Sequence, residues 1–386
     1  MSKKKQRQIR TDFRKNRVER QRKVNFTRDF AAGEPEEIDS VREERISGKG
    51  ELSRRRTVRA ADETACADDS NSQPVLAVDE AVCLAGRVLK VNGLLSTVET
   101  ADGRRYQCAT RRLLKTISTD LRHVVVAGDH VLIRPADDKE GIIERVERRY
   151  GVLSRASRGR QHTIVANVDQ LLIVGSAAEP YLKPNLIDRY LMSAEKAHIR
   201  PLIVINKIDL VEPAGLMPLV GVYSQMGYPV ILTSARSGTG VDRLRRELVD
   251  RQTAVVGQSG VGKSSLLNAT EPGLALRVAS VSQETQKGRH TTTTAELLRT
   301  QSGGYLVDTP GIRQFQLWDI VPAEVQNYFR DLRPYVGLCK FPDCSHTHEE
   351  ECAVKDAVAD DLLDVRRYES YLSILEGSLD DLEDWS

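Results

Sequence analysis

The sequence has few aromatic residues and no long hydrophobic stretch. Only 5% of its 386 residues are aromatic, and apolar runs such as Val124–Ala127 and Leu202–Ile205 are short. A membrane-spanning helix needs about 20 consecutive, mostly apolar residues. We therefore expect no transmembrane segment and no membrane partner. The hydrophobic content of 40% is still sufficient for several separate cores, which at this length suggests two or three domains.

The first 25 residues also lack the apolar segment that a secretory signal requires. They carry eleven Lys or Arg against Asp12 and Glu19. We therefore expect a cytoplasmic protein. Residues 356–386 show the opposite bias, with ten Asp or Glu against two Arg. The overall charge of +2 hides this asymmetry, and the basic end predicts an anionic partner such as nucleic acid.

Cysteine is scarce, and half of the six cysteines lie in one short segment. They form the pattern Cys339-x4-Cys344-x-His346-x5-Cys352. Three thiolates and one imidazole within fourteen residues suit a structural Zn²⁺ ion with tetrahedral coordination. The alternative is a set of buried free cysteines, and the nearby His348 is redundant as a ligand. We predict one structural zinc ion per chain.

The residue pattern changes along the chain and divides it into an extension, a β-rich segment and a segment of alternating strands and helices. Residues 1–79 have few apolar positions and predict a disordered basic and polar extension. Residues 80–150 contain short strands separated by turns, which indicate a small barrel of the OB-fold type that binds RNA. The predicted strands span 83–91, 95–100, 104–109, 124–133 and 141–146. Basic residues are expected on one side of the barrel, where they either bind nucleic acid or simply form a solvated strand face. They are Arg104, Arg105, Arg111, Arg112 and Lys115.

Beyond a polar linker at 155–162, strands alternate with amphipathic helices. This pattern predicts a parallel sheet covered by helices, as in α/β proteins. The predicted strands span 170–177, 201–205, 229–233, 253–256 and 305–307, and the helices span 186–197, 241–248 and 262–269. We assign 163–317 to this α/β domain and 318–386 to a small α-rich zinc-binding domain with acidic C-terminal helices. In the latter, Tyr368, Tyr371, Leu372 and Leu375 have helical spacing and indicate core positions.

A phosphate-binding loop follows the strand at 253–256. The segment matches G-x-x-x-x-G-K-[ST] and opens a helix, which is the context that this motif requires. Glycines let the backbone N–H groups surround the phosphates, Lys263 supplies a charge, and the Ser264 hydroxyl is a ligand for Mg²⁺. The loop consists of Gly257, Gln258, Ser259, Gly260, Val261, Gly262, Lys263 and Ser264.

A second motif, after the strand at 201–205, favours guanine over adenine. It consists of Asn206, Lys207, Ile208 and Asp209. The carboxylate of Asp209 can accept two hydrogen bonds from the N1–H and the 2-amino group of guanine, a donor pair that adenine lacks. Asn206 either reaches the base or braces the loop, and Ser234 and Ala235 follow the next strand, where a backbone N–H can reach the guanine carbonyl. Each signal is weak alone, but together they predict a GTP site.

A third motif predicts the γ-phosphate and Mg²⁺ contacts. In Asp308-Thr309-Pro310-Gly311, the carboxylate of Asp308 suits a water-mediated Mg²⁺ contact, and the N–H of Gly311 suits the γ-phosphate. The run Thr291–Thr294 offers a further Mg²⁺ ligand, with Thr292 or Thr293 favoured, although a Thr-rich strand edge is the alternative. Because Asn206–Asp209 precedes the phosphate loop, the order of the motifs is that of a circularly permuted GTPase.

With these motifs, the sequence resembles the family of ribosome small-subunit-dependent GTPase A, RsgA/YjeQ. The resemblance extends from about residue 80 to the end and includes Ser265 beside the phosphate loop. It implies an OB-fold, a permuted GTPase domain and a zinc domain. It also implies a role in late maturation of the small (30S) ribosomal subunit, with 16S rRNA bound, GTP hydrolysed on stimulation by the subunit, and the protein acting as a monomer.

One position of the third motif bears on catalysis. The glutamine that orients water in many GTPases is replaced here by Ile312, which has no hydrogen-bonding group. Asp319 stands after Leu317-Trp318, where members of the family often have a histidine. His290 is therefore the candidate catalytic residue. Two alternative functions are a non-hydrolysing, GTP-dependent scaffold that binds rRNA and a small-molecule kinase, and Asn206–Asp209 argues against the kinase.

Overall fold

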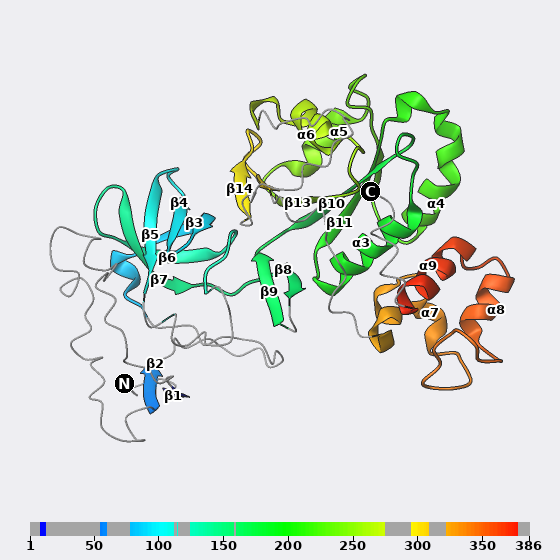
Figure 1. Ribbon diagram of the computed structural model, residues 1–386, viewed down its shortest axis with the longest axis horizontal. Coiled ribbons are helices and arrows are strands. Elements are labelled where there is room, and N and C mark those ends of the chain that lie inside the picture. Colours follow the sequence, from blue (N-terminus) through cyan, green and yellow to red (C-terminus); the bar gives the residue numbers. More distant parts are fainter. Residues whose placement is uncertain are drawn as a thin grey trace, which may run out of the picture.

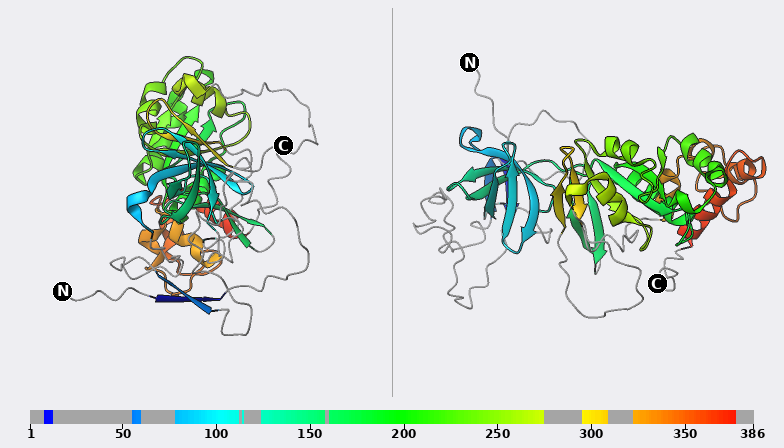
Figure 2. Two further views of the ribbon diagram at one scale, coloured as in Figure 1. Left: turned by 90° about the vertical axis from the view of Figure 1, so that its left-hand side faces the viewer. Right: turned by 90° about the horizontal axis from the view of Figure 1, so that it is seen from above.

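Three units lie in a row in the computed structural model (Figures 1 and 2). A barrel at one end is followed by an α/β unit in the middle and a small helical unit at the other end. None of the helices that the structure describes is long and apolar enough to cross a membrane. The structure describes residues 8–12, 55–59, 78–111, 114, 124–157, 160–274, 295–308 and 322–376.

The predicted extension at residues 1–79 contains one described feature that the sequence analysis did not predict. Strands β1 (Gln8–Asp12) and β2 (Arg55–Arg59) pair in antiparallel fashion, with Gln8 opposite Arg59. The rest of that extension, apart from residues 78 and 79, lies outside the described residues.

The barrel has five strands and closes on itself. Strand β3 pairs with β4 on one side and with β6 on the other, and β5 and β7 complete the circle. Side chains that alternate along the strands fill the interior, among them Val88, Val98 and Ile133, each with no exposed surface. This confirms the predicted small β-barrel. The strands are β3 (Leu84–Asn92), β4 (Leu95–Thr100), β5 (Arg105–Thr110), β6 (His130–Pro135) and β7 (Glu140–Val146).

One predicted barrel strand is shorter than expected. The prediction of a strand from 124 to 133 is wrong for its first six residues, because β6 begins only at His130. Gly128 has a φ of 89°, and the carboxylate of Asp129 accepts the backbone N–H of Val126 at 2.8 Å. A side chain that bonds to its own backbone in this way stabilises a turn in place of a strand.

The α/β unit has a six-stranded sheet in the order β12-β11-β10-β13-β15-β14. The first five strands are parallel, and β14 is antiparallel to β15. Central strands are apolar on both faces because helices cover both. Side chains of α3 and α4 pack on one face and those of α5 and α6 on the other. The strands are β10 (Gln170–Ser176), β11 (Arg200–Asn206), β12 (Val230–Leu232), β13 (Gln252–Val256), β14 (Glu296–Arg299) and β15 (Tyr305–Asp308), and the helices are α3 (Pro184–Lys196), α4 (Met217–Gln225), α5 (Val241–Leu248) and α6 (Lys263–Thr270).

The segment predicted as a polar linker, 155–162, forms a hairpin instead. Strands β8 (Leu153–Ser157) and β9 (Arg160–Val165) pair in antiparallel fashion and lie between the barrel and the α/β unit (Figure 1). Leu153 and Val165 are buried at the base of the hairpin, at 1% and 0% exposure. Burial of these two apolar ends favours strand pairing in a segment whose middle is polar.

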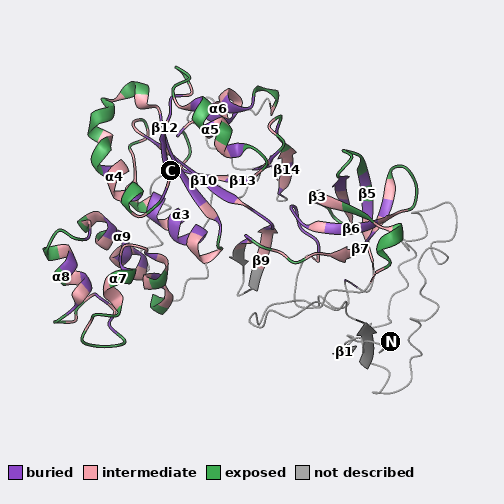
Figure 3. Cartoon of the chain, turned by 180° about the vertical axis from the view of Figure 1, so that it is seen from behind, coloured by how far each residue is buried: buried purple, intermediate pink, exposed green. Residues whose placement is uncertain are grey.

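The C-terminal unit is helical and packs against α3. It consists of a 3-10 helix (Pro322–Tyr328), α7 (Arg333–Val336), α8 (Ala353–Ala359) and α9 (Val365–Leu375). Its core includes Phe329, Leu332 and Tyr371, which confirms the core assignment of Tyr371. Tyr368, Leu372 and Leu375 pack against that core and are partly buried. Figure 3 shows α9 with its buried residues close to α3.

Candidate active site and metal centre

The predicted nucleotide-binding motifs gather at one edge of the sheet. Strands β10, β11, β12, β13 and β15 run parallel, so their carboxyl ends meet at the same edge, where ligands of open α/β sheets bind. Asn206 is the last residue of β11, Gly257 follows β13 directly, and Asp308 is the last residue of β15. The sheet thus places Asn206, the phosphate loop and Asp308 at the same edge, although 102 positions separate Asn206 from Asp308 in the sequence.

The phosphate loop has the backbone that only glycine tolerates. At Gly257, with a φ of 142°, an added Cβ would lie 2.1 Å from the carbonyl oxygen of Val174. At Gly262, with a φ of 88°, it would lie 2.6 Å from Nδ2 of Asn206. Positive φ values and close contacts together exclude larger residues. Gln258, Val261 and the start of α6 at Lys263, Ser264 and Ser265 complete the loop, while Ser259 and Gly260 are exposed.

Asn206 ties the base-selecting motif to the phosphate loop. Its Nδ2 donates to the carbonyl oxygen of Val261 at 2.9 Å, and its Oδ1 accepts the N–H of Ala235 at 3.2 Å and the hydroxyl of Thr233 at 3.3 Å. Asn206 is 1% exposed. Of the two roles left open by the sequence, the structure has Asn206 bracing the loop. Thr233 is fully buried directly after β12, and it begins the segment Thr233-Ser234-Ala235 that the sequence indicates, but the contact of its hydroxyl with Asn206 was not predicted.

Asp209 faces Ser234 at the end of the site where the sequence predicts base binding. The Ser234 hydroxyl donates to Asp209 Oδ1 at 2.6 Å, and this hydrogen bond lowers the pKa of the Asp209 carboxyl. The carboxylate therefore stays ionised and accepts hydrogen bonds near neutral pH. Ile208 begins the short 3-10 helix that presents Asp209.

Two lysines contact backbone carbonyls at this edge. Lys263 Nζ donates to the carbonyl oxygens of Gly257 and Gln258, each at 2.7 Å. Lys207 Nζ donates to the carbonyl oxygen of Glu179, in the loop that follows β10. A backbone acceptor such as Glu179 leaves no trace in the sequence, so that contact was missed. The contacts place both ammonium groups beside the phosphate loop and its neighbouring loop.

Several predicted site residues lie outside the described residues. They are His290, Thr292, Thr293 and Gly311, together with Ile312. For Asp308 the structure describes the backbone, which is paired with Glu296 of β14.

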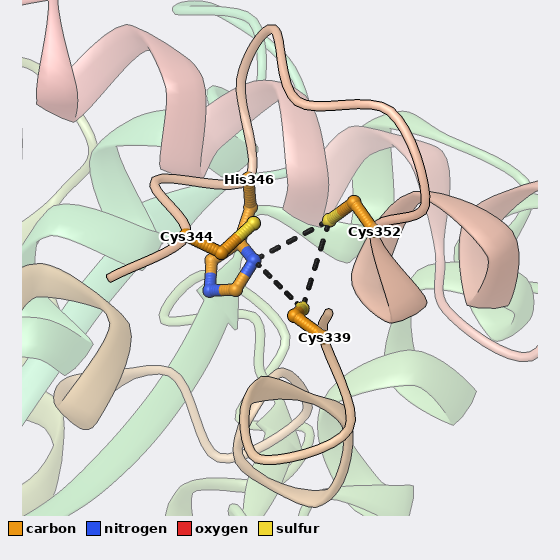
Figure 4. Close-up of side chains that lie close together, drawn as sticks. All are labelled: Cys339, Cys344, His346 and Cys352. Carbon is orange, nitrogen blue, oxygen red and sulfur yellow. Dashed lines mark hydrogen bonds between the residues drawn. The ribbon is translucent and has the colours of Figure 1, made fainter. Parts of the chain in front are cut away.

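The four predicted zinc ligands converge in the C-terminal unit (Figure 4). Their ligand atoms all lie within 4.8 Å of one another. His346 Nδ1 lies 3.4 Å from the sulfurs of Cys339 and Cys352, and Cys344 is also buried. This donor set and its spacing fit a tetrahedral Zn²⁺ ion with no open position. Burial raises the pKa of the Cys344 thiol to about 12, so a bound cation has to displace that proton.

Residues around the cluster fix the orientation of its histidine. Nε2 of His346 lies 2.8 Å from Oε1 of Gln326, so a proton on Nε2 leaves the lone pair of Nδ1 facing the thiols. The hydroxyls of Tyr368 and Tyr371 donate to the carbonyl oxygens of His346 and Ser345 at 2.6 and 2.9 Å. Gln326 and these two hydroxyl roles were not predicted, because none of them belongs to the ligand pattern.

His348 takes no part in the cluster, as expected. It is exposed, and its Nδ1 lies 2.9 Å from the hydroxyl of Thr347.

The basic residues predicted along the barrel have acidic neighbours. Arg104 contacts Asp102 at 3.1 Å, Arg105 contacts Glu99 at 3.1 Å, and Arg111 contacts Glu144 at 3.0 Å. Arg104 and Arg105 remain more than half exposed. Arg112 and Lys115 are outside the described residues. These pairs reduce the net positive charge of this part of the barrel.

Comparison with known proteins gives consistent matches over most of the chain. A family model described as RsgA GTPase matches residues 146–318. A protein of Saccharophagus degradans named small ribosomal subunit biogenesis GTPase RsgA is 42% identical over 313 residues, covering 77% of this chain and 88% of that protein. A protein of the same name from Chlorobaculum parvum is 40% identical over 310 residues, covering 77% and 99%.

Solved structures match as well. The crystal structure of YjeQ from Thermotoga maritima is similar with a TM-score of 0.64 and 36% identity, covering 76% of this chain and 98% of that one. YloQ, described as a circularly permuted GTPase, is similar with a TM-score of 0.62 and 30% identity, covering 79% and 98%. The permuted order of motifs is thus shared with a solved relative.

Proposed function

The chain belongs to the RsgA GTPase family, and we propose that it hydrolyses GTP during biogenesis of the small ribosomal subunit. The observation that carries this proposal is the contact of Asn206 with the phosphate loop. It joins a guanine-selecting motif to a phosphate-binding motif at one sheet edge. Relatives at about 40% identity are named small ribosomal subunit biogenesis GTPase, and this name supports the proposed role in biogenesis of the small subunit.

The residues of the site have separate roles in the proposed reaction. The Asp209 carboxylate accepts the two guanine donors, and Lys263 exchanges its carbonyl contacts for the phosphates. We infer that Ser264, Asp308 and either Thr292 or Thr293 hold Mg²⁺, which when bound neutralises charge on the phosphates. The remaining GTP contacts are assigned to Gly311 and to the loop residues from Gly257 to Ser265. His290 is our candidate for positioning the attacking water in place of the side chain that Ile312 lacks.

We propose that the Cys339, Cys344, His346 and Cys352 cluster holds one structural zinc ion. The set provides three thiols and one oriented imidazole, which together are the four ligands of a closed structural zinc site. The ion would cross-link the loop between α7 and α8, which carries all four residues. A metal bound in this way contributes directly to the folding free energy of a small unit.

We propose that the anionic partner is 16S rRNA of the subunit, bound by the basic N-terminal extension and the barrel. The positive net charge of the first 25 residues supports this, because Lys and Arg side chains bind phosphates. Each phosphate contact releases counterions, so binding should weaken as the salt concentration rises. We further propose the domain boundaries 1–79, 80–150, 163–317 and 318–386, a monomeric state and a cytoplasmic location.

The deciding experiment is GTP hydrolysis by the full chain, alone and with purified small ribosomal subunits. We expect stimulation by small subunits and none by large subunits, which serve as the control. Lys263→Ala should abolish nucleotide binding and with it the stimulated activity. Tight GTP binding without any stimulated phosphate release would instead support the scaffold that binds rRNA without hydrolysis, the alternative that Ile312 favours.

A further inference from the structure

The barrel contacts the two strands that adjoin the predicted Mg²⁺-binding threonine run and the third motif. Strand β14 begins at Glu296, two residues after the run Thr291–Thr294, and strand β15 ends at Asp308. These strands form the edge of the α/β sheet that faces the barrel. Glu296 pairs with Lys90 of β3, so the hydrogen-bonded sheet continues from one unit into the other (Figure 1).

A first side-chain contact lies at this backbone pairing. Lys90 Nζ contacts Glu296 Oε2 at 2.7 Å, and both side chains are partly exposed, at 26% and 43%. A pair of this exposure contributes little to stability. Its significance is its position, because it connects barrel strand β3 to the first residue of β14.

A second contact is buried and involves three partners of one carboxylate. Glu99 of β4 is 3% exposed. Its Oε2 accepts the hydroxyl of Tyr305, the first residue of β15, at 2.8 Å, and lies 3.6 Å from Nη1 of Arg299, the last residue of β14. Its Oε1 accepts Nε of Arg105, within the barrel, at 3.1 Å. One carboxylate therefore joins a barrel strand to both strands of the α/β edge.

The polar contacts continue from Tyr305 along the boundary. The Arg87 guanidinium lies over the Tyr305 ring at 4.7 Å from its centroid, and Arg87 Nη2 lies 2.8 Å from His130 Nε2. The ring of His130 meets that of Tyr150 edge-on at 6.4 Å. The Tyr150 hydroxyl in turn donates to Asp169 Oδ1 at 3.1 Å.

This chain of contacts ends at the strand that leads into the phosphate loop. Asp169 Oδ2 accepts the backbone N–H of Gln252, the first residue of β13, at 2.7 Å. The boundary between the two units is thus linked by polar groups to β13, β14 and β15. These are the three strands that adjoin the phosphate loop, the threonine run and Asp308.

We propose that Glu99 is a positioning residue for the proposed GTP hydrolysis, and that it couples the nucleotide state of the α/β unit to the barrel. It does so by holding the ends of β14 and β15 at a fixed place on the barrel. Glu99 is 3% exposed while its partners Arg105 and Arg299 are 60% and 49% exposed, so the buried carboxylate keeps its hydrogen bonds only while β14 and β15 stay in place. A displacement of either strand is therefore transmitted to β3 and β4. By the same coupling, binding of a partner to the barrel shifts the positions of β14 and β15.

The chain offers a matched control for Glu99. Glu144 is also a buried barrel carboxylate, 6% exposed, and it contacts two arginines, Arg111 at 3.0 Å and Arg134 at 2.8 Å. Both of these arginines belong to the barrel and its adjoining segment. Glu144→Ala should therefore disturb the barrel as Glu99→Ala does, while leaving the contacts with β14 and β15 intact.

The experiment is hydrogen exchange of the full chain, loaded with Mg²⁺ and either GDP or a non-hydrolysable GTP analogue. In the wild type and in Glu144→Ala, we expect the amide exchange rates to differ between the GDP-bound and the analogue-bound states by about fivefold or more. This difference should appear in residues 295–308 and also in barrel residues 84–100. In Glu99→Ala, the change should be confined to the α/β unit. Glu99→Gln keeps an acceptor for Tyr305 without the charge, so the barrel should respond to the nucleotide less than in the wild type. This variant provides the measurement if Glu99→Ala is poorly folded.

Three results would overturn the inference. The first is a barrel response to the nucleotide that is the same in both Glu99 variants as in the wild type. The second is no barrel response in the wild type, and the third is a loss of that response in Glu144→Ala equal to the loss in Glu99→Ala. The inference concerns the proposed GTPase, but hydrogen exchange needs no ribosomal subunits. If small subunits fail to stimulate the wild type, the proposed subunit-stimulated hydrolysis is wrong, while the exchange data still decide whether Glu99 couples the two units.

A kinetic measurement separates positioning from a general loss of folding. With small subunits present, Glu99→Ala should lower the maximal stimulated rate about tenfold, the size of a typical coupling effect. The GTP affinity of the isolated protein should remain within about twofold of wild type, because the contacts described for Glu99 are with Arg105, Arg299 and Tyr305, outside the predicted nucleotide site. A fall in GTP affinity that matches the fall in rate would contradict a positioning role.

Discussion

The guanidinium of Arg367 in α9 lies 2.7 Å from the carboxylate of Asp188 in α3, and both side chains are almost fully buried, at 3% and 2% exposure. Arg367 also donates two hydrogen bonds to Asp331, at 2.8 and 2.9 Å, and lies over the ring of Phe329. Asp188 accepts the hydroxyl of Tyr223 at 2.8 Å. Arg367 thus joins the C-terminal unit to a helix of the α/β unit, beside further contacts such as Arg333 with Glu195 and Ser370 with Asn185.

Replacing Arg367 by methionine should destabilise the protein strongly. Two carboxylates would lose their partner, and Asp188 would remain buried without a counter-charge, which costs about 3–5 kcal/mol. Urea unfolding with separate signals for the two units measures this. The neighbouring Arg366, 41% exposed and paired with Asp364, is the control, and Arg366→Ala should cost less than about 1 kcal/mol.

Asp209→Asn should relax the preference for guanine. The amide no longer accepts both donors of the base, and a hydrogen bond to a charged group contributes about 1.5–3 kcal/mol. Competition between GTP and ATP for the full chain measures the change. The same variant should gain affinity for xanthosine triphosphate, whose carbonyl at C2 can accept the new amide N–H. Unchanged discrimination between GTP and ATP would contradict the assignment of Asp209.

Gly262→Ala should weaken nucleotide binding by about a hundredfold or more. Its Cβ would collide with Nδ2 of Asn206 and break the brace between the two motifs. Gly238 is a suitable control, since it also has a positive φ, 81°, but an added Cβ would meet nothing within 4 Å. Gly238→Ala should therefore report backbone strain alone, about 1 kcal/mol in stability, with nucleotide affinity retained.

Metal analysis of the purified protein should find one zinc ion per chain. His346→Ala should lose it, and the C-terminal unit should then unfold at lower temperature and be cleaved faster by protease. His348→Ala should keep the metal, because that exposed histidine lies outside the cluster. Equal zinc content in both variants would rule out the Cys₃His set.

Stability should fall when the pH is lowered below about 6.5, through His130. Burial lowers the pKa of this histidine, and the charge of Arg87 lowers it further, while Asp169 and Glu147 oppose the shift. The unfolded chain therefore takes up a proton at a higher pH than the folded one, and stability decreases as the pH falls through that window. Unfolding at pH 7.5 and 5.5 measures the loss. His130→Gln should show a smaller pH dependence.

The architecture could be predicted because its signals are local. Strand and turn patterns gave the barrel, and the phosphate loop with its neighbouring strand and helix gave the GTPase fold. The four zinc ligands lie within fourteen residues, so their spacing alone brought them together. Each of these features depends on residues close in the sequence. The described structure and the comparisons confirm the barrel and the GTPase fold, and the structure brings the four predicted metal ligands together, while zinc itself stays a prediction.

Features that depend on tertiary context could not be predicted. Glu99 and Tyr305 are 206 positions apart, and neither belongs to a motif. The hairpin β8–β9 forms in a polar segment because its two ends are buried by other elements. The contact of Lys207 uses a backbone carbonyl, which every residue possesses. The turn at Gly128 delays the start of β6 to His130, and the apolar residues before that turn resemble those of a true strand.

The strand order of the α/β sheet also bears on how the chain is made. Synthesis proceeds from the N-terminus, so β10, β11 and β12 emerge with Asn206 before β13 exists. β10 pairs with β11 on one side, but its other edge stays open until Gln252–Val256 has left the ribosome. An apolar strand with an open edge readily pairs with other chains. The nascent protein thus carries the predicted guanine-binding motif for some time without the strand that closes the sheet beside it, and GTP can assist folding only after residues 252–265 have been made.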